Sequence, residues 1–186
     1  MKAGRKRTPF AVAPAALAAG FGASGKAPLE LVDALDLERY QGTWYEIAKL
    51  PNRFQARCMA ETTAEYTLLD DGRIRVVNRC RVADDRFDTV RGTARRPDPD
   101  RPGALEVRFA PGWLSWLPMV WGDYQVMAID DAYSSVLVGA PSRTCLWILA
   151  REPELAPARI DALLAEARRQ GFPVDRIEFA GLESAR

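Results

Sequence analysis

The sequence predicts an all-β domain, either a sandwich or an up-and-down barrel, with one α-helix near its carboxyl end. Eight short strand-like runs follow one another with turn signals between them, and one later segment has helical spacing. The chain of 186 residues is 48% hydrophobic, which is enough for the core of one domain. Strand spacing by itself does not decide between the sandwich and the barrel.

The expected strands follow a linker over 26–34 and a short turn over 35–40. They cover residues 43–50, 60–69, 74–82, 88–95, 104–109, 124–129, 134–139 and 145–151. Asp70-Asp71-Gly72 is the strongest hairpin signal between them, because Asp and Gly tolerate the backbone of a tight turn.

The helix is expected over 157–170. Ile160, Leu163, Leu164 and Ala167 recur at helical spacing on one face, and Gly171 stands where a helix ends. The opposite face is charged, so we expect this helix to lie on the wall of the barrel with its apolar face inward. A short strand over 176–180 follows.

The first 25 residues predict an export signal peptide. A basic stretch, Lys2 to Arg7, precedes an apolar run over 10–21 and small residues up to Gly25; the alternative is a disordered tail. No cysteine precedes Cys58, so no residue here matches a lipid-attachment cysteine. We expect a periplasmic protein, with association with the outer membrane as a further expectation.

Charge and composition exclude some function classes. Of the 26 basic residues four lie in the leader, which leaves 22 against 25 acidic residues and no electrostatic footprint for nucleic acid. The chain contains no His, the commonest metal ligand and general base. We expect no metal, no cofactor and no catalysis.

Three short motifs carry a family resemblance. They are Gly42-Thr43-Trp44 at the first strand, Asp131-Ala132-Tyr133 between two late strands, and Arg151 at the end of the last barrel strand. Together they resemble the lipocalin family. The strings GTWYEIAKLPNRF, WGDYQVMAID and LWILAREP are similar to the bacterial lipocalin branch, akin to apolipoprotein D and plant temperature-induced lipocalins.

The resemblance implies a fold. It favours an eight-stranded up-and-down antiparallel barrel over 35–182, with the helix packed on its wall. The structural signature would be Gly42, Trp44, Asp131, Tyr133 and Arg151. Arg151 would lie over Trp44 at the closed end, in a cation–π contact.

Strand alternation then assigns the interior. If Trp44 points inward, the candidate ligand-binding residues share its face. They are Ala48, Ala64, Tyr66, Val76, Asn78, Val107, Phe109, Tyr124, Val126, Trp147 and Leu149. Such a surface suits a long apolar guest with one polar end. The alternative is a packed core; small residues favour a cavity, namely Ala48, Ala64, Gly92, Ala94, Ala128 and Gly139.

The segment 111–121 is unusually apolar for a loop. Trp113, Trp116 and Trp121 are costly to leave in water, so they either fold over the barrel or form a lip at its mouth. Such a lip would contact a membrane or a second copy of the chain. The resemblance also makes a homodimer one expected partner.

Three cysteines allow three pairings. In a hairpin that turns at Asp71, Cys58 and Cys80 both come to the open end and share a face. An exported protein is oxidised, so we expect a Cys58–Cys80 disulfide, with Cys145 as the other candidate partner.

The resemblance implies binding, storage or transport of fatty acids, lysophospholipids or similar amphiphiles, for envelope maintenance under stress. One alternative is an enzyme on the same barrel, an isomerase or a peroxide-reducing protein, which would need a reactive group in the pocket. The candidates are Cys80, Cys145, Tyr66, Tyr124 and Glu46. Another is a structural envelope protein that acts through its Trp-rich loop.

Overall fold

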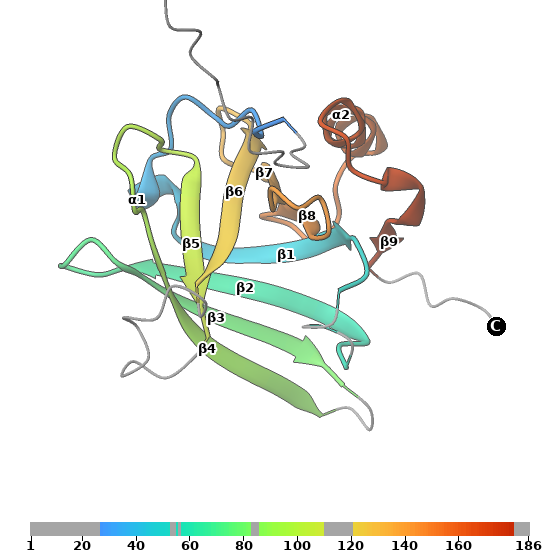
Figure 1. Ribbon diagram of the computed structural model, residues 1–186. Coiled ribbons are helices and arrows are strands. Elements are labelled where there is room, and N and C mark those ends of the chain that lie inside the picture. Colours follow the sequence, from blue (N-terminus) through green and yellow to red (C-terminus); the bar gives the residue numbers. More distant parts are fainter. Residues whose placement is uncertain (1–26, 53–54, 56, 83–85, 110–120, 181–186) are drawn as a thin grey trace, which may run out of the picture.

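The computed structural model describes residues 27–52, 55, 57–82, 86–109 and 121–180, and shows a barrel of strands with a helix on one side (Figure 1). The strands in these residues are β1 (Gly42–Lys49), β2 (Ala60–Leu68), β3 (Ile74–Arg81), β4 (Phe87–Arg95), β5 (Ala104–Arg108), β6 (Gly122–Ile129), β7 (Ser135–Gly139), β8 (Leu146–Ala150) and β9 (Glu178–Phe179). The helices are α1 (Leu37–Tyr40), α2 (Pro157–Arg169) and the 3-10 turn η4 (Val174–Arg176).

The strands close on themselves. Their order is β2-β3-β4-β5-β6-β7-β8-β1-β9, and β1 also pairs with β2, so β1 to β8 form a barrel and β9 extends one edge. Each neighbouring pair is antiparallel. The predicted strands and helix are therefore confirmed, each within about two residues, and the barrel is confirmed over the sandwich.

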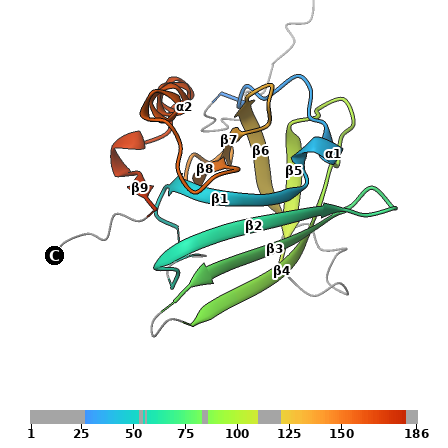
Figure 2. The same cartoon turned by 180° about the vertical axis from the view of Figure 1, so that it is seen from behind.

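The β2–β3 hairpin shows how local chemistry sets the register. Gly72 has a φ of 78°, and the Asp71 carboxylate accepts a hydrogen bond of 3.0 Å from the backbone N–H of Arg73. This turn lies at the end of the barrel that α1 closes. The barrel therefore has a closed end, where α1 lies, and an open end, where β1 and β3 end and β2 and β4 begin (Figure 2).

Two apolar clusters lie on the two sides of the barrel wall. The first lies inside the barrel and includes Trp44 and Leu149. The second lies between the wall and α2, where Ile148 packs with Leu163 and Ala167. Helix α2 thus covers β7, β8 and β1, while β2, β3 and β4 lie on the opposite side of the molecule (Figures 1 and 2).

The expectation that Ala48 faces the interior is wrong. The β1–β8 register shifts between Glu46 and Ala48, and a bulge of this kind moves the following side chains to the other face. Ala48 is fully buried in the helix-side cluster. A similar shift between Val126 and Ala128 in β6 sends Ala128 to the same cluster.

Gly139 also lies on the helix side of the wall. A Cβ at this position would come within 2.6 Å of the Phe172 ring, which belongs to the helix-side cluster. Three of the six small residues that favoured a roomy interior, Ala48, Ala128 and Gly139, therefore lie on the helix side of the wall.

Residues 27–34, expected as a linker, pack on the barrel. Leu29 is 6% exposed in the helix-side cluster, and the backbone N–H of Val32 donates to the carbonyl of Val126 over 3.1 Å. Gly103 makes room for this segment, because a Cβ there would lie 3.0 Å from Leu31. The predicted leader over 1–25 lies outside the described residues. So do Trp113 and Trp116 of the apolar segment.

Candidate functional site

The closed end is built on Trp44. Its side chain is fully buried, and its indole Nε1 donates a hydrogen bond of 2.9 Å to the carbonyl of Tyr40. The Arg151 guanidinium lies 3.9 Å above the ring and also donates to the carbonyls of Thr43, Arg39 and Tyr133. The expected cation–π contact is confirmed. One arginine therefore links the ends of several elements, which makes this pair a structural feature.

Gly42 allows this approach. Its φ is 92°, in the region that favours glycine, and a Cβ there would lie 3.3 Å from Arg151 Nη1. The Gly-x-Trp spacing thus places a residue without a side chain under the arginine and the large ring two positions later.

The β6–β7 turn closes the same end, and its main side chain is Asp130. The Asp130 carboxylate accepts hydrogen bonds from the backbone N–H groups and hydroxyls of both Ser134 and Ser135. Burial opposes ionisation, but these bonds outweigh it and lower the pKa of Asp130 to about 2. Asp131 is exposed and supplies only its carbonyl, to Arg39.

Sequence reasoning chose Asp131 and missed Asp130. The signal that would have found Asp130 is the serine pair four and five residues later, because short hydroxyl side chains return to a turn aspartate. Tyr133 stands at a φ of 57°, and its hydroxyl accepts from the backbone N–H of Asp36, which ties the turn to α1.

Three tyrosine hydroxyls meet inside the barrel near this floor. The Tyr124 hydroxyl lies 2.7 Å from that of Tyr40 and 2.9 Å from that of Tyr66, and all three side chains are buried. Burial raises the pKa of Tyr66 to about 12 and raises that of Tyr40 and Tyr124 as well. Sequence reasoning found Tyr66 and Tyr124 by alternation but missed Tyr40, which comes from α1.

This cluster has one hydroxyl proton more than its contacts can use. Three phenols carry three protons, and two oxygen–oxygen contacts use two of them. Among the described residues, the third proton therefore has no acceptor in a hydrogen bond. A buried donor without an acceptor costs about 1–3 kcal/mol, so a water or ligand oxygen fits here.

The inner wall above the floor is mostly apolar. The predicted site residues in the interior cluster are Ala64, Tyr66, Val76, Val107, Tyr124, Val126, Trp147 and Leu149. Asn78 shares their face, since it pairs with Ala64, and its Oδ1 is buried without a hydrogen-bond partner. Phe109 also points inward, because its ring covers Gly92, which is opposite Val76.

The interior is exposed at the open end. Val90 pairs with Asn78 and so faces inward, yet it is 45% exposed, and Phe109 is 41% exposed. At the closed end, by contrast, Val76 and Val126 on the same face are buried almost completely. The inward face thus changes from packed to solvent-accessible along the barrel axis.

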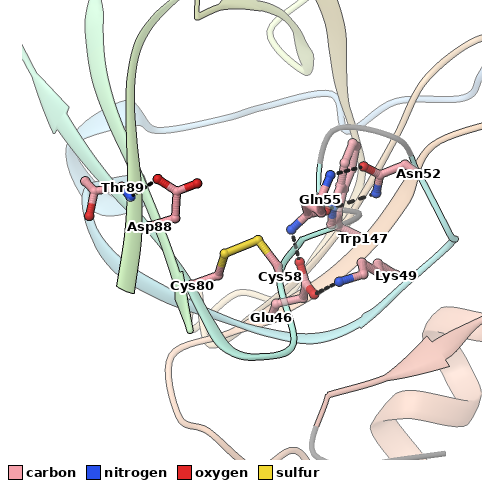
Figure 3. The surroundings of a disulfide bond; sticks show 9 residues. All are labelled: Glu46, Lys49, Asn52, Gln55, Cys58, Cys80, Asp88, Thr89 and Trp147. Carbon is pink, nitrogen blue, oxygen red and sulfur yellow. Dashed lines mark hydrogen bonds and ion pairs between the residues drawn. A yellow bond between two sulfur atoms is a disulfide. The ribbon is translucent and has the colours of Figure 1, made fainter. Parts of the chain in front are cut away.

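A polar network borders the open end (Figure 3). Trp147 Nε1 donates to Gln55 Oε1 over 2.8 Å, and Gln55 Nε2 donates to Glu46 Oε2 over 2.6 Å. Lys49 Nζ lies 2.9 Å from Glu46 Oε1, and Asn52 Nδ2 donates to Gln55 Oε1. The Glu46 side chain is only 5% exposed, and Lys49 is its ion-pair partner. Sequence reasoning placed Glu46 inside but missed Gln55, which comes from a connection without periodicity.

The disulfide lies beside this network. Cys58 and Cys80 are bonded, with Cα atoms 5.5 Å apart, as the hairpin register predicts (Figure 3). It ties the start of β2 to the end of β3 at the open end. Cys145 is free and partly exposed.

Trp121, expected in an apolar lip, instead lies on the outer face of β4 and β5. Its ring has the Arg95 guanidinium at 4.0 Å and that of Arg108 at 5.1 Å. Arg95 also pairs with Glu106 at 2.8 Å. A tryptophan between two cations is stabilised without entering an apolar surface.

No group of three or more His, Cys, Asp or Glu side chains in the described part of the chain could hold a metal ion. No helix there is long and apolar enough to span a bilayer. A pocket of about 230 Å³ lies outside the barrel, between the 29–33 segment and the β4–β5 loop.

Comparison with known proteins agrees with this architecture. A family model described as a lipocalin-like domain matches residues 35–181. Temperature-induced lipocalin-1 of Arabidopsis thaliana is 38% identical over 82% of each chain. Outer membrane lipoprotein Blc of Escherichia coli K12 is 36% identical over 78% of each. Among solved structures, insecticyanin from the tobacco hornworm Manduca sexta superposes with a TM-score of 0.65 at 21% identity, over 86% of this chain and 87% of that one.

Proposed function

Because this chain belongs to the lipocalin family, we propose that it binds a fatty acid, a lysophospholipid or a similar amphiphile inside its barrel, without catalysing a reaction. The observation that supports this most is the change along the inner face. Val90 and Phe109 face inward but are 45% and 41% exposed, while the floor beneath them is buried. Apolar groups that face inward and still reach solvent favour an interior with room for a guest.

The distribution of polar groups favours an amphiphile over a plain hydrocarbon. The middle of the wall is apolar, with Val76, Val107 and Leu149. Glu46, Lys49 and Gln55 stand at the open end, where a polar head would remain near water. A tail would then run along the apolar wall toward the tyrosine floor, where the spare hydroxyl proton suits one oxygen or a water.

Three of the candidate reactive groups for an enzyme, Cys80, Tyr66 and Tyr124, are poorly suited to catalysis. Cys80 is held in the disulfide, so it is no free nucleophile. Burial raises the pKa of Tyr66 to about 12 and that of Tyr124 above its usual value, so both stay neutral at physiological pH. The state of these three groups therefore favours the binding proposal over the enzyme proposal.

The location proposal rests on the relatives. One is called an outer membrane lipoprotein and another a temperature-induced lipocalin. We infer a role in the periplasm at the outer membrane, in lipid storage or transport for envelope maintenance under stress. A homodimer stays a prediction, tested by the mass of the protein in dilute solution.

The test is calorimetric titration with oleate and with a lysophospholipid, below the concentrations at which they form micelles. Trp147→Ala removes a large ring from the mouth, and we expect about tenfold weaker binding from the lost contact area. Trp121→Ala is the matched control, because that ring lies on the outer wall, and it should bind as the parent does. The proposal is wrong if the parent binds neither amphiphile, or if the two variants bind alike.

A further inference from the structure

The outer face of β3 and β4 carries three arginines without an acidic partner. Arg75, Arg79 and Arg91 are exposed, and no ion pair joins any of them to a carboxylate among the described residues. Two arginines nearby do have such partners: Arg81 pairs with Glu61 at 2.9 Å, and Arg95 pairs with Glu106. We refer to Arg75, Arg79 and Arg91 as the arginine triangle.

The strand register brings the triangle together. Arg91 of β4 is directly opposite Val77 of β3, and Arg75 and Arg79 stand two residues to either side of Val77. Diagonal neighbours of this kind are about 7–8 Å apart at their Cα atoms, which long side chains easily bridge. Three guanidinium groups can therefore converge above Val77 on one group with several acceptor oxygens.

Two of the arginines are held by neighbours that leave their charge unneutralised. The Arg79 guanidinium lies 3.8 Å from the centre of the Phe87 ring, and Arg75 Nη2 donates to the hydroxyl of Thr67 over 3.2 Å. Thr67 lies opposite Arg75 on β2 and Phe87 lies opposite Arg81, so both contacts draw the side chains away from Val77. Both are exposed contacts without a counter-charge, which the guanidinium groups can exchange for an anion above Val77. Guanidinium groups match phosphate geometry because each offers paired donors in one plane.

The arrangement is unfavourable for an isolated barrel. Like charges on diagonal neighbours repel each other, and among the described residues the strand register places one carboxylate beside the triangle, that of Glu65 opposite Val77. Without its leader the chain has more acidic than basic residues, so the triangle is a local positive region on a slightly acidic protein. An anionic partner would remove the repulsion.

The triangle lies on a wall that no other described element covers. Helix α2 packs against the other side of the barrel, and the outer faces of β3 and β4 look away from it (Figures 1 and 2). Phe87 is 42% exposed on the same face, at its open end. An exposed aromatic ring beside arginines suits the boundary between lipid headgroups and acyl chains.

We propose that this face docks on the surface of a membrane that contains anionic phospholipids, with the arginine triangle bound to lipid phosphates. The choice of a membrane over other polyanions rests on the proposed lipid-carrier function, because a carrier must meet the bilayer that supplies or receives its guest. Docking through β3 and β4 would place the open end of the barrel, with Phe87, beside the headgroups.

The test is cosedimentation of the protein with phosphatidylcholine vesicles that contain or lack phosphatidylglycerol. The parent should bind only the anionic vesicles and should be released by high salt. The variant with Arg75→Gln, Arg79→Gln and Arg91→Gln should bind them roughly a hundredfold more weakly, since each basic group near such a surface contributes about a fivefold effect and the three effects multiply. Its melting temperature should be no lower than that of the parent, because all three side chains are exposed and the variant removes their mutual repulsion.

A matched control separates the site from net charge. The variant with Arg101→Gln, Arg168→Gln and Arg176→Gln makes the same charge change at exposed arginines elsewhere. It should keep most of the binding, and Glu65→Gln should strengthen it. The proposal is overturned if the parent ignores anionic vesicles, if both triple variants lose binding equally, or if the parent binds double-stranded DNA as tightly through the same arginines.

Separate experiments test the docking proposal and the carrier proposal, so either can be refuted without the other. The triangle variant should still bind oleate in the calorimetric titration with the affinity of the parent, because the triangle lies outside the barrel. A parent that binds anionic vesicles but takes up no amphiphile would support docking and refute the carrier. A parent that takes up oleate but ignores anionic vesicles would do the reverse.

Discussion

The two ends of the barrel use the same residue types for opposite purposes. At the closed end Trp44 is fully buried, and its indole donates to a backbone carbonyl beneath the Arg151 guanidinium. At the open end Trp147 is partly exposed, and its indole donates to the side chain of Gln55, which also reaches Glu46. Backbone partners are held by the fold itself, whereas side-chain partners can rearrange. We therefore expect the closed end to contribute more to stability than the open end.

The largest effect should come from the tryptophan of the closed end. Trp44→Ala removes a fully buried ring and the surface on which Arg151 rests, so we expect a loss of about 3–5 kcal/mol in the free energy of unfolding. Urea denaturation followed by circular dichroism measures it. Trp147→Ala, measured alongside, should lose much less. Equal losses at the two positions would refute the contrast between the ends.

The disulfide is the main covalent support of the open end. Replacing Cys58 and Cys80 together by Ala frees a loop with a sequence separation of 22, and we expect about 3 kcal/mol less stability in the chain-entropy model. Cys145→Ala is the control and should change little, because that thiol is unpaired. Denaturation midpoints of the three proteins test this. A double variant as stable as the parent would show that the open end needs no such support.

A smaller and pH-dependent effect belongs to Asp130 of the closed end. Its folded pKa of about 2 lies below the ordinary value of 3.8, so its carboxylate stabilises the fold fully above about pH 4. That contribution is lost as the pH falls through 2. Asp130→Asn should cost about 1–2 kcal/mol at neutral pH and should flatten the pH dependence of stability between 4 and 2.

The control for this prediction is Asp131→Asn, whose side chain is exposed and makes no contribution to the turn beyond its backbone. Thermal melts of both variants across acid pH check the assignment. If Asp131→Asn has the larger effect, the sequence-based choice of Asp131 is restored.

Alternation along the strands predicted most of the inner wall, and it failed where the backbone departs from regular pairing. Val76, Tyr124 and Leu149 follow the period of two and lie inside. Counting every second residue also assigns Ala48 and Ala128 to the inside, but a bulge precedes each of them and turns it to the helix side. A bulge adds one residue against a partner strand, and the local sequence of β1 or β6 gives no sign of it.

The residues that sequence reasoning missed come from outside the strands. Tyr40 reaches the tyrosine cluster from α1, and Gln55 reaches the mouth network from the β1–β2 connection. Periodicity assigns faces only within regular elements, so a side chain from a turn or connection has no predictable direction. Trp121 was misplaced for the same reason.

The sequence by itself determined the elements and favoured the Cys58–Cys80 disulfide, and its resemblance to the lipocalin family implied the closed-end pair. The elements follow from alternating runs between turn residues, and the disulfide follows from two cysteines that flank one hairpin with an even separation. Only the tertiary structure decided which strand faces meet α2, where the bulges fall, and that Arg75, Arg79 and Arg91 surround Val77. Those outcomes depend on register between strands that are far apart in the chain, and register is set by packing of the whole barrel.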